Sequence, residues 1–479
     1  MHLYIHIPFC IKKCLYCDFL SIPVDCGKVS LYVKSLINDI KTEAANHKMR
    51  GSEPLTTIYI GGGTPSILNS SQIKSIFDAI YSNFKISENP EITIEVNPCT
   101  VTPEKLAMYR ECGINRVSMG VQSFDDNTLK TLGRAHNAAT ALNAYEMLRK
   151  TGFTNVNLDL ISCVPGDGGL KKDNTISTYF ENDRYDKDRY DKNRNERITV
   201  AKRMINEGKI QSFIDSLRLL VYLEPEHIST YQLIIEEGTP FYEMYETDTC
   251  GRDNINKADD FLNKKRLFTE DEQAEIYLKT SEILKSAGYE HYEISNFSKP
   301  GYESRHNTAY WMQEDYIGCG AGAVGFLTER DGTGHIVSGM RTKKQDDITL
   351  YIEAYSDEKI TANTNKKIKT YSDNGSAAYF AKYTIENISI NDLYSEHIML
   401  ALRMRPGFSP KRFVEVFGEE DSLDSDNPDS NNNQTKKKLQ EYTKVLERYM
   451  PKYVTFDGEA YSFTEEGFLV SNTILSELI

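Results

Sequence analysis

Three cysteines near the start of the sequence carry its most specific chemistry. Cys10, Cys14 and Cys17 follow the spacing C-x3-C-x2-C. Three thiolates spaced in this way can bind three irons of a [4Fe–4S] cluster, which leaves the fourth iron open to a small molecule, unlike the usual four-cysteine arrangement. The alternatives are a zinc knuckle and unrelated thiols. A closed zinc site needs four ligands, usually as two pairs, and the sequence contains no second C-x2-C pair.

A glycine turn and several polar side chains lie near the ends of apolar, strand-like runs. Gly61-Gly62-Gly63-Thr64 follows such a run, and glycines allow backbone groups to approach a ligand closely. Glu95, Gln122 and Asp159 lie at or near the ends of later runs. Because ligands bind at the carboxyl ends of parallel strands, we expect these groups to lie beside the cysteine loop. As structural alternatives, a strand-end carboxylate could satisfy a helix amino terminus or form a buried salt bridge.

Strand-like and helix-like segments alternate through the first part of the chain. Short apolar runs predict strands at 3–7, 57–60, 91–96, 116–121, 154–160, 227–232 and 289–294. Helical spacing of apolar residues and helix caps predict helices at 29–47, 73–80, from Thr102, at 138–150, 214–222 and 269–286. About six strand–helix repeats indicate an α/β fold in which a parallel sheet is covered by helices.

Charged stretches interrupt this order, and the last hundred residues differ in character. The segment 167–209 contains the repeat Asp-Arg-Tyr-Asp-Lys twice and has few apolar residues, so we interpret it as a solvated, flexible insertion. Two shorter stretches of this kind lie at 246–263 and 419–438. Helices at 395–403 and 439–449, a two-stranded wing at 453–463 and a closing helix at 464–478 predict a small winged-helix-like domain.

Composition restricts the classes of partner and compartment. The 479 residues carry a formal net charge of −14, which repels nucleic acid phosphates. The sequence has no apolar run long enough to span a membrane and no signal-peptide pattern. Nine cysteines, three of them within eight residues, indicate a metal site in a reducing compartment rather than a disulfide framework. We therefore expect a cytoplasmic protein without a membrane span or a nucleic acid partner.

Six segments in order resemble the HemW/HemN group of radical S-adenosylmethionine (SAM) proteins, relatives of oxygen-independent coproporphyrinogen III oxidase. They are YIHIPFC at 4–10, GGGTPS at 61–66, RVSMGVQSF at 116–124, NLDLI at 157–161, IEEGTP at 235–240 and YEISNF at 292–297. The resemblance implies a partial (βα)6 radical SAM barrel over 1–327, a connecting segment at 328–390 and the helical, winged-helix-like domain at 391–479. It also implies that the open iron chelates SAM, with further SAM contacts from Tyr4, Gly62, Gly63, Thr64, Glu95, Gln122, Arg134 and Asp159.

Two features resemble the haem-chaperone branch, HemW, rather than the oxidase branch. The oxidase branch has a further cysteine two residues after the last cluster cysteine, where this chain has Phe19. The segment HNTAYW at 306–311 matches a motif associated with haem binding in the chaperone branch, which implies haem contacts from His306, Asn307, Tyr310 and Trp311. We expect this motif in a loop near the open side of the barrel, with haem binding weakened below a histidine pKa of roughly 6.5. The alternative for His306 is a core histidine. Relatives have Gly-Ala-His where this chain has Val324 after Gly322-Ala323.

The sequence thus predicts a haem chaperone that binds a [4Fe–4S] cluster, SAM and haem, and passes the haem to an acceptor such as a respiratory protein. Two alternatives stay open. A coproporphyrinogen III oxidase would use a 5′-deoxyadenosyl radical to remove hydrogen from propionate side chains with loss of CO2. An RNA-modifying radical enzyme is disfavoured by the negative net charge. The sequence leaves open whether the chain is an enzyme, and whether it is a monomer or a dimer.

Overall fold

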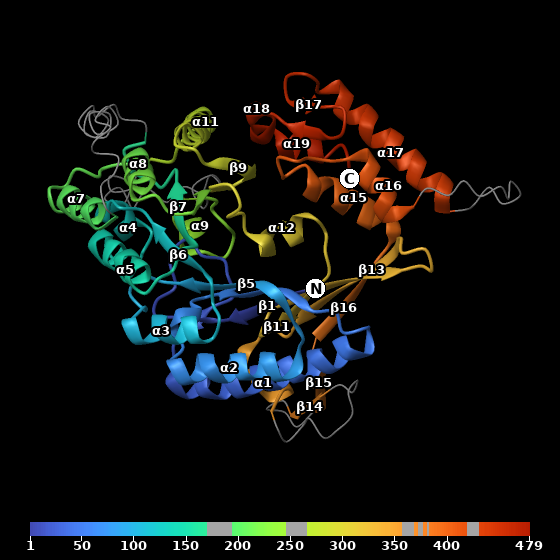
Figure 1. Ribbon diagram of the computed structural model, residues 1–479, viewed down its shortest axis with the longest axis horizontal. Coiled ribbons are helices and arrows are strands. Elements are labelled where there is room, and N and C mark those ends of the chain that lie inside the picture. The colour runs from blue at the N-terminus through green and yellow to red at the C-terminus, as the bar shows by residue number, and fades with distance from the viewer. Residues whose placement is uncertain (170–193, 246–265, 357–367, 372–376, 381–382, 419–430) are drawn as a thin grey trace, which may run out of the picture.

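A mixed sheet of twelve strands organises the computed structural model (Figure 1), which describes residues 1–169, 194–245, 266–356, 368–371, 377–380, 383–418 and 431–479. Its strand order is β16-β13-β12-β11-β1-β4-β5-β6-β7-β8-β10-β9. Seven consecutive members are parallel. One is β11 (Tyr316–Cys319), and the other six are predicted by the sequence: β1 (His2–Ile7), β4 (Leu55–Gly62), β5 (Ile86–Val96), β6 (Arg116–Gln122), β7 (Val156–Ser162) and β8 (His227–Gln232). At one edge the chain adds the antiparallel pair β9 (Glu290–Glu293) and β10 (Asn296–Ser298).

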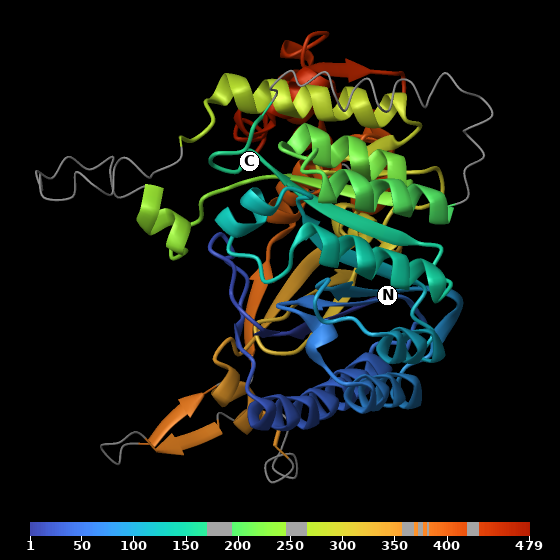
Figure 2. The ribbon, with the colours of Figure 1, turned by 90° about the vertical axis from the view of Figure 1, so that its left-hand side faces the viewer.

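Helices between the strands cover the outer face of this sheet. Figure 2 shows them stacked from blue to yellow-green: α1 (Cys26–Met49), α2 (Ser70–Asn83), α3 (Pro103–Glu111), α5 (Ala138–Lys150), α8 (Phe213–Leu223) and α11 (Glu270–Ser286). Their starts follow local capping chemistry. The Thr102 side chain accepts a hydrogen bond from the Lys105 N–H, and Thr269 and Glu272 form the predicted capping box. Shorter elements nearby are a turn of 3-10 helix (η1, Pro65–Ile67), α4 (Asp126–Thr131) and α9 (Pro240–Tyr245).

Alternation along the parallel strands separates an apolar outer face from a polar inner face. In β1, Leu3, Ile5 and Ile7 belong to the apolar core that packs under the helices. The intervening residues Tyr4 and His6 hydrogen-bond to each other instead, because successive side chains of a strand point to opposite faces. The interior of the barrel is therefore lined by polar groups.

One helix contradicts the expected insertion at 167–209. Residues Arg194–Asn206 form α7, which buries Ile198, Ala201 and Met204. Lys202 also pairs with Glu146 of α5 at 2.7 Å. Three apolar residues at a spacing of three place one helix face on the core, so the expectation of a solvated, flexible segment is wrong for this part. The charged repeat at 183–192 lies outside the described residues.

The segment expected to connect two domains also contributes to the main sheet. Beyond β11 (Tyr316–Cys319) the sheet continues through β12 (Val324–Arg330), β13 (Ile336–Lys344) and β16 (Tyr383–Ile388), all antiparallel to their neighbours. Helix α13 (Ile348–Ala354) packs on α1. The strands β14 (Ile368–Tyr371) and β15 (Ala377–Phe380) form a separate hairpin.

The carboxyl-terminal residues build a second apolar core. It is formed by α15 (Ile390–Ala401), α16 (Pro410–Phe417), α17 (Asn431–Arg448), the hairpin β17 (Val454–Phe456) and β18 (Tyr461–Phe463), and the short helices α18 (Glu465–Leu469) and α19 (Ser471–Leu475). The two helices and the two-stranded wing agree with the sequence, whereas the expected closing helix is interrupted at Val470. None of the described helices is both long and apolar enough to cross a membrane.

Candidate functional site

The cysteine loop begins where β1 ends and is fastened to the barrel by backbone hydrogen bonds. Cys10 lies in the short strand β2 (Phe9–Cys10), which pairs with β3 (Ile22–Pro23). The Leu15 N–H donates to the Leu132 carbonyl at 3.1 Å, and the Phe241 N–H donates to the Leu15 carbonyl at 3.0 Å. These bonds hold the loop open between Cys10 and Cys17.

The three cysteines of the loop lie close enough for their charges to interact. Cys10 is buried, Cys14 and Cys17 are partly exposed, and none forms a disulfide with another described cysteine. Burial raises the pKa of the Cys17 thiol, the Phe19 N–H opposes that shift, and negative charge on Cys14 and Cys10 raises the pKa further. Ligating thiols must lose their protons, and a bound iron cluster would supply the positive charge that stabilises several thiolates together. The described residues contain no group of three or more His, Cys, Asp or Glu side chains gathered around a single metal position, so the fit to a cluster rests on the type and spacing of the three thiols.

The glycine turn at the end of β4 leaves no room for side chains. At Gly62, where φ is +109°, an added Cβ would lie 2.5 Å from the His6 ring. The Gly62 N–H donates to Glu95 Oε2 at 3.0 Å, and the Tyr59 hydroxyl donates to Glu95 Oε1 at 2.7 Å. The Gly63 N–H bonds to the Ile7 carbonyl at 2.9 Å. Backbone and carboxylate are thereby fixed beside the end of β1, where the cysteine loop starts.

Thr64 links this turn to the cysteines. Its hydroxyl lies 3.4 Å from the Cys10 sulfur, and the residue is buried at the start of η1. The structure therefore brings the glycine turn and the cysteine loop to the same end of the barrel, as the sequence predicts.

Gln122, Arg134 and Asp159 gather over one point of β6. A Cβ added at Gly120 would lie 2.8 Å from Gln122 Nε2, 3.3 Å from Arg134 Nη2 and 3.9 Å from Asp159 Oδ2. Arg134 donates to the Gly120 carbonyl at 2.6 Å and to the Cys14 sulfur at 3.5 Å. Gln122 Oε1 and Arg134 Nε are buried without a hydrogen-bond partner. Orphaned polar atoms of this kind are rare inside proteins and are suited to a polar ligand.

Burial brings the pKa values of the two carboxyl groups of the site close to neutral pH. It raises the pKa of Glu95 to about 7, against the hydrogen bond from Tyr59 that stabilises the ionised form. It raises the pKa of Asp159 to about 6, against a hydrogen bond from Asn157 at 2.6 Å. Amino or hydroxyl donors of a ligand would stabilise both carboxylates.

The haem-motif residues lie at the other end of the barrel, which contradicts the expected position in a loop at the open side. They form α12 (Arg305–Trp311), whose first N–H groups bond to Glu91. Figure 1 shows α12 between the sheet and the carboxyl-terminal helices, and it packs on β4 and α15. Its contact on β4 includes Thr57, near the start of that strand, whereas the cysteine loop adjoins the strand's end. Long-range packing, which the motif itself does not encode, decides this placement.

His306 is a buried histidine with both ring nitrogens engaged. Nδ1 lies 2.6 Å from the Thr57 hydroxyl and Nε2 lies 2.8 Å from the Tyr310 hydroxyl. The ring stacks on Tyr59 at 5.0 Å between centroids. Burial, aided by His2 and Arg116, lowers its pKa to about 3, so the expected protonation near pH 6.5 is wrong. Asn307, Tyr310 and Trp311 are partly exposed on the same helix.

Three interior residues were missed by the sequence reasoning. Nδ1 of His6 lies 2.9 Å from the Tyr4 hydroxyl, and its Nε2 donates to the Leu20 carbonyl at 3.0 Å. Tyr59 fixes Glu95, and Arg116 lies 2 % exposed inside the barrel. The alternation of polar and apolar residues in β1, β4 and β6 could have identified all three.

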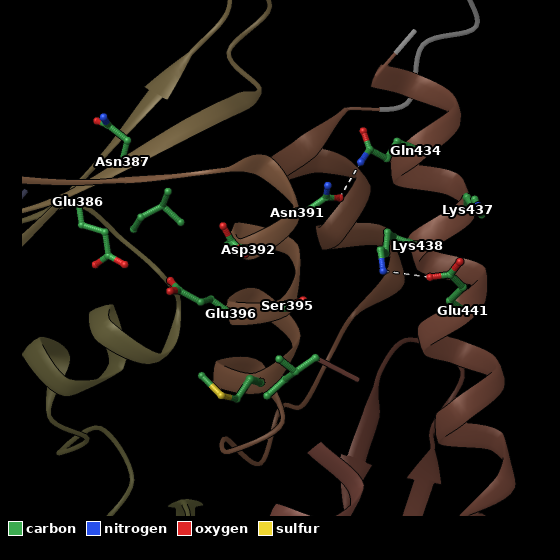
Figure 3. A pocket seen from close by; sticks show the side chains of 13 residues that line it. Glu386, Asn387, Asn391, Asp392, Ser395, Glu396, Gln434, Lys437, Lys438 and Glu441 are labelled. Carbon is green, nitrogen blue, oxygen red and sulfur yellow. Dashed lines mark hydrogen bonds and ion pairs between the residues drawn. The ribbon is translucent and has the colours of Figure 1, made fainter. Parts of the chain in front are cut away.

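Two hollows lie apart from the cysteines. A cavity of about 930 Å³ beside α12 is lined by residues that include Arg305, Ala309, Met404 and Arg405. A groove of about 640 Å³ separates α15 from α17 (Figure 3). Gln434 of α17 donates to Asn391 of α15 at 2.6 Å, and within α17 Lys438 pairs with Glu441 at 3.1 Å.

Comparisons with known proteins agree with this geometry. Residues 4–169 match the radical SAM superfamily. A protein of Lactococcus lactis named heme chaperone HemW is 31% identical over 86% of this chain and 84% of its own length. The Bacillus subtilis protein of that name is 30% identical over 88% and 87%, and the Escherichia coli protein is 33% identical over 69% and 71%.

One solved structure shares the fold over the whole chain. The coproporphyrinogen III oxidase HemN of Escherichia coli, described as a radical SAM enzyme, superimposes with a TM-score of 0.65 at 19% identity. The match covers 100% of this chain and 89% of that protein. The predicted α/β radical SAM fold followed by a helical carboxyl-terminal region is confirmed.

Proposed function

The chain belongs to the HemW family of radical SAM proteins, and we propose that it binds a [4Fe–4S] cluster, SAM and haem and transfers the haem to an acceptor protein. The observation that carries the proposal is the meeting of the three cysteines, the glycine turn and the Gln122–Arg134–Asp159 group at one end of the barrel. The relatives named heme chaperone support the haem part.

Each residue of the site has a proposed task. Cys10, Cys14 and Cys17 hold the cluster, which when bound supplies an open iron to SAM. The backbone of Gly62 and Gly63, with Thr64, approaches the amino end of SAM. The fork of Arg134 suits the SAM carboxylate, and Asp159, Gln122, Glu95 and Tyr4 offer hydrogen-bond partners to its ribose and amino groups.

The haem part of the proposal requires His306 to exchange a partner. A neutral imidazole can bind iron only through a nitrogen that is not hydrogen-bonded, and both nitrogens of His306 face hydroxyl groups. We therefore propose that haem binding moves α12 so that Tyr310 or Thr57 releases the ring. Asn307, Tyr310 and Trp311 would then contact the porphyrin.

We also propose the division into a radical SAM core at 1–327, a connecting segment at 328–390 and a carboxyl-terminal domain at 391–479. The second apolar core, formed mainly by the carboxyl-terminal helices, supports a separate carboxyl-terminal unit, while the connecting segment contributes residues to both cores. The strands β12, β13 and β16 join the main sheet, so we expect the carboxyl-terminal domain to be held rigidly.

An anaerobic assay separates the proposed chaperone from the oxidase. The reconstituted protein is incubated with coproporphyrinogen, SAM and a reductant for porphyrin analysis, and is titrated with haem in parallel. Phe19, 67% exposed, stands where the oxidase branch has a cysteine, so we expect haem binding without decarboxylated product. Formation of protoporphyrinogen would favour the oxidase. A variant with Cys10→Ser, Cys14→Ser and Cys17→Ser should lose the cluster and serves as the control.

A further inference from the structure

Arg116 is a buried charge without an ion-paired carboxylate among the described residues. It opens β6 on the same face as Ser118, whose hydroxyl accepts a hydrogen bond from Asn157, its cross-strand neighbour on β7. The residue is 2 % exposed, and its Nε has no hydrogen-bond partner. Among the described residues no carboxylate lies within ion-pair distance of its guanidinium. Burying an unpaired charge is costly, so such a group is expected to meet an anion in the working protein.

A second orphaned donor lies directly beside it. Thr93 of β5 is the cross-strand neighbour of Arg116. The residue is 0 % exposed, and its hydroxyl has no hydrogen-bond partner in the part of the chain that the structure describes. A guanidinium and a hydroxyl on adjacent strands can together bind the two oxygens of one carboxylate.

Strand register places Arg116 near both candidate sites. Its neighbour Thr93 pairs with Tyr59 of β4, and Tyr59 donates to Glu95 and stacks on the His306 ring. Burial dominates the raised pKa values of Glu95 and Asp159, and the Arg116 charge acts on both in the opposite direction. On the other side burial lowers the pKa of His306, and the charges of His2 and Arg116 add to that effect. The guanidinium is therefore within electrostatic reach of both the SAM candidates and the haem candidate.

Arg149 is a second buried arginine of this fold, and it has an ion-pair partner. Its side chain is 4% exposed, its Nη1 lies 2.7 Å from Glu226 Oε2, and its Nη2 donates to the Tyr145 hydroxyl at 2.8 Å. The Nε atoms of both arginines lack a hydrogen-bond partner among the described residues, so the two differ in the ion pair, which Arg149 forms with Glu226 and Arg116 does not form with any described carboxylate.

We propose that Arg116 and Thr93 form a binding site for a ligand carboxylate inside the barrel. The inference rests on the proposed function, in which two ligands carry carboxylates. Beside the cysteines, the guanidinium of Arg134 is the group proposed for the SAM carboxylate. Arg116 lies on the side of His306, so the carboxylate that it would bind is a haem propionate.

The test compares haem with its dimethyl ester, which lacks free carboxylates, in absorbance titrations of the reconstituted full chain. The parent should bind haem at least about tenfold more tightly than the ester, the size of one charged hydrogen bond. In Arg116→Gln the ratio of haem affinity to ester affinity should fall towards one, while the affinity for the ester stays unchanged. Thr93→Val should lower the ratio less, and Arg116→Lys should retain part of it.

Arg305→Gln is the matched control, because Arg305 adjoins His306 but is exposed and donates to the Asn89 carbonyl at 2.7 Å. Its ratio should equal that of the parent. SAM affinity is measured for each variant as a second arm. If the haem ratio of Arg116→Gln is unchanged and SAM affinity falls about tenfold, the carboxylate is that of SAM. If neither changes, the site does not exist.

A readout without ligand separates this inference from the proposed function. Arg116→Met removes an unpaired charge and should raise the melting temperature of the unliganded chain, whereas Arg149→Met breaks an ion pair and should lower it. Failure of the parent to bind haem would overturn the proposed function, and the SAM arm and the melting comparison would still decide the role of Arg116. A fall in melting temperature for Arg116→Met would contradict an unpaired charge.

Discussion

Gly62→Ala should both destabilise the barrel and abolish SAM binding. The φ of +109° costs an alanine about 1–2 kcal/mol. The new Cβ would also lie 2.5 Å from the His6 ring, which cannot retreat because Tyr4 and the Leu20 carbonyl hold it at 2.9 and 3.0 Å. Overpacking of this kind costs about 1–3 kcal/mol. The two contributions together predict a loss of about 2–5 kcal/mol in the free energy of unfolding.

Gly152→Ala separates the two contributions. Gly152 follows α5 with a φ of +88°, and a Cβ there would meet nothing within 4 Å, so only the backbone cost of about 1–2 kcal/mol applies. Urea unfolding of both variants and calorimetric titration with SAM measure the effects. Gly62→Ala should lose the additional stability and the SAM affinity, while Gly152→Ala should keep its affinity. Equal stability losses, or SAM affinity retained in Gly62→Ala, would refute the steric argument.

Three further predictions follow from buried groups. Burial raises the pKa of Glu95 from 4.5 to about 7, so the unliganded parent loses stability as the pH rises and the unfolded chain ionises first. Glu95→Gln should therefore be more stable than the unliganded parent by about 2–3 kcal/mol at pH 8 and equally stable at pH 4, as measured by urea unfolding. His306→Ala should weaken haem binding and shift the Soret band while SAM affinity is unchanged. The haem affinity of the parent should not fall between pH 7 and 5 in absorbance titrations, because burial holds the pKa of His306 at about 3. A fall in haem affinity near pH 6.5 would contradict this. Met204→Ala should cost about 2–4 kcal/mol in urea unfolding, whereas Asn206→Ala on the exposed side of α7 should cost little; no difference between them would mean that α7 is not part of the core.

Local chemistry made much of the fold predictable. The helix Ala138–Lys150 and the strand His227–Gln232 have the boundaries that the sequence indicates, because caps and apolar periodicity act over a few residues. The cysteine loop, the glycine turn and Glu95 could be brought together for a similar reason. Each lies in the last residues of a parallel strand or just after it, and parallel strands end at one edge.

Composition alone failed for α7. The segment 167–209 is charged on average, and the average hid Ile198, Ala201 and Met204 on one helix face. The ion pairs of Lys202 with Glu146 and of Arg197 with Glu224 also place charged residues in the packing contact. Periodicity over a single turn outweighs mean composition when a neighbouring helix is available.

Arg116 was missed because the segment 116–121 was identified only as an apolar run, whereas His306 was misplaced because its motif does not encode the long-range packing of α12. Strands covered on both sides by packed helices read as continuous hydrophobic runs, yet β1 reads His-Leu-Tyr-Ile-His-Ile. When polar and apolar residues alternate in a strand and its apolar face packs in the core, its polar face must border other polar groups or a ligand. An arginine at an inward position of such a strand is then a candidate binding group, and Arg116 occupies that position next to Thr93. A histidine from a distant segment such as His306 can join the same interior because hydroxyl groups there, from Thr57 and Tyr310, satisfy its ring.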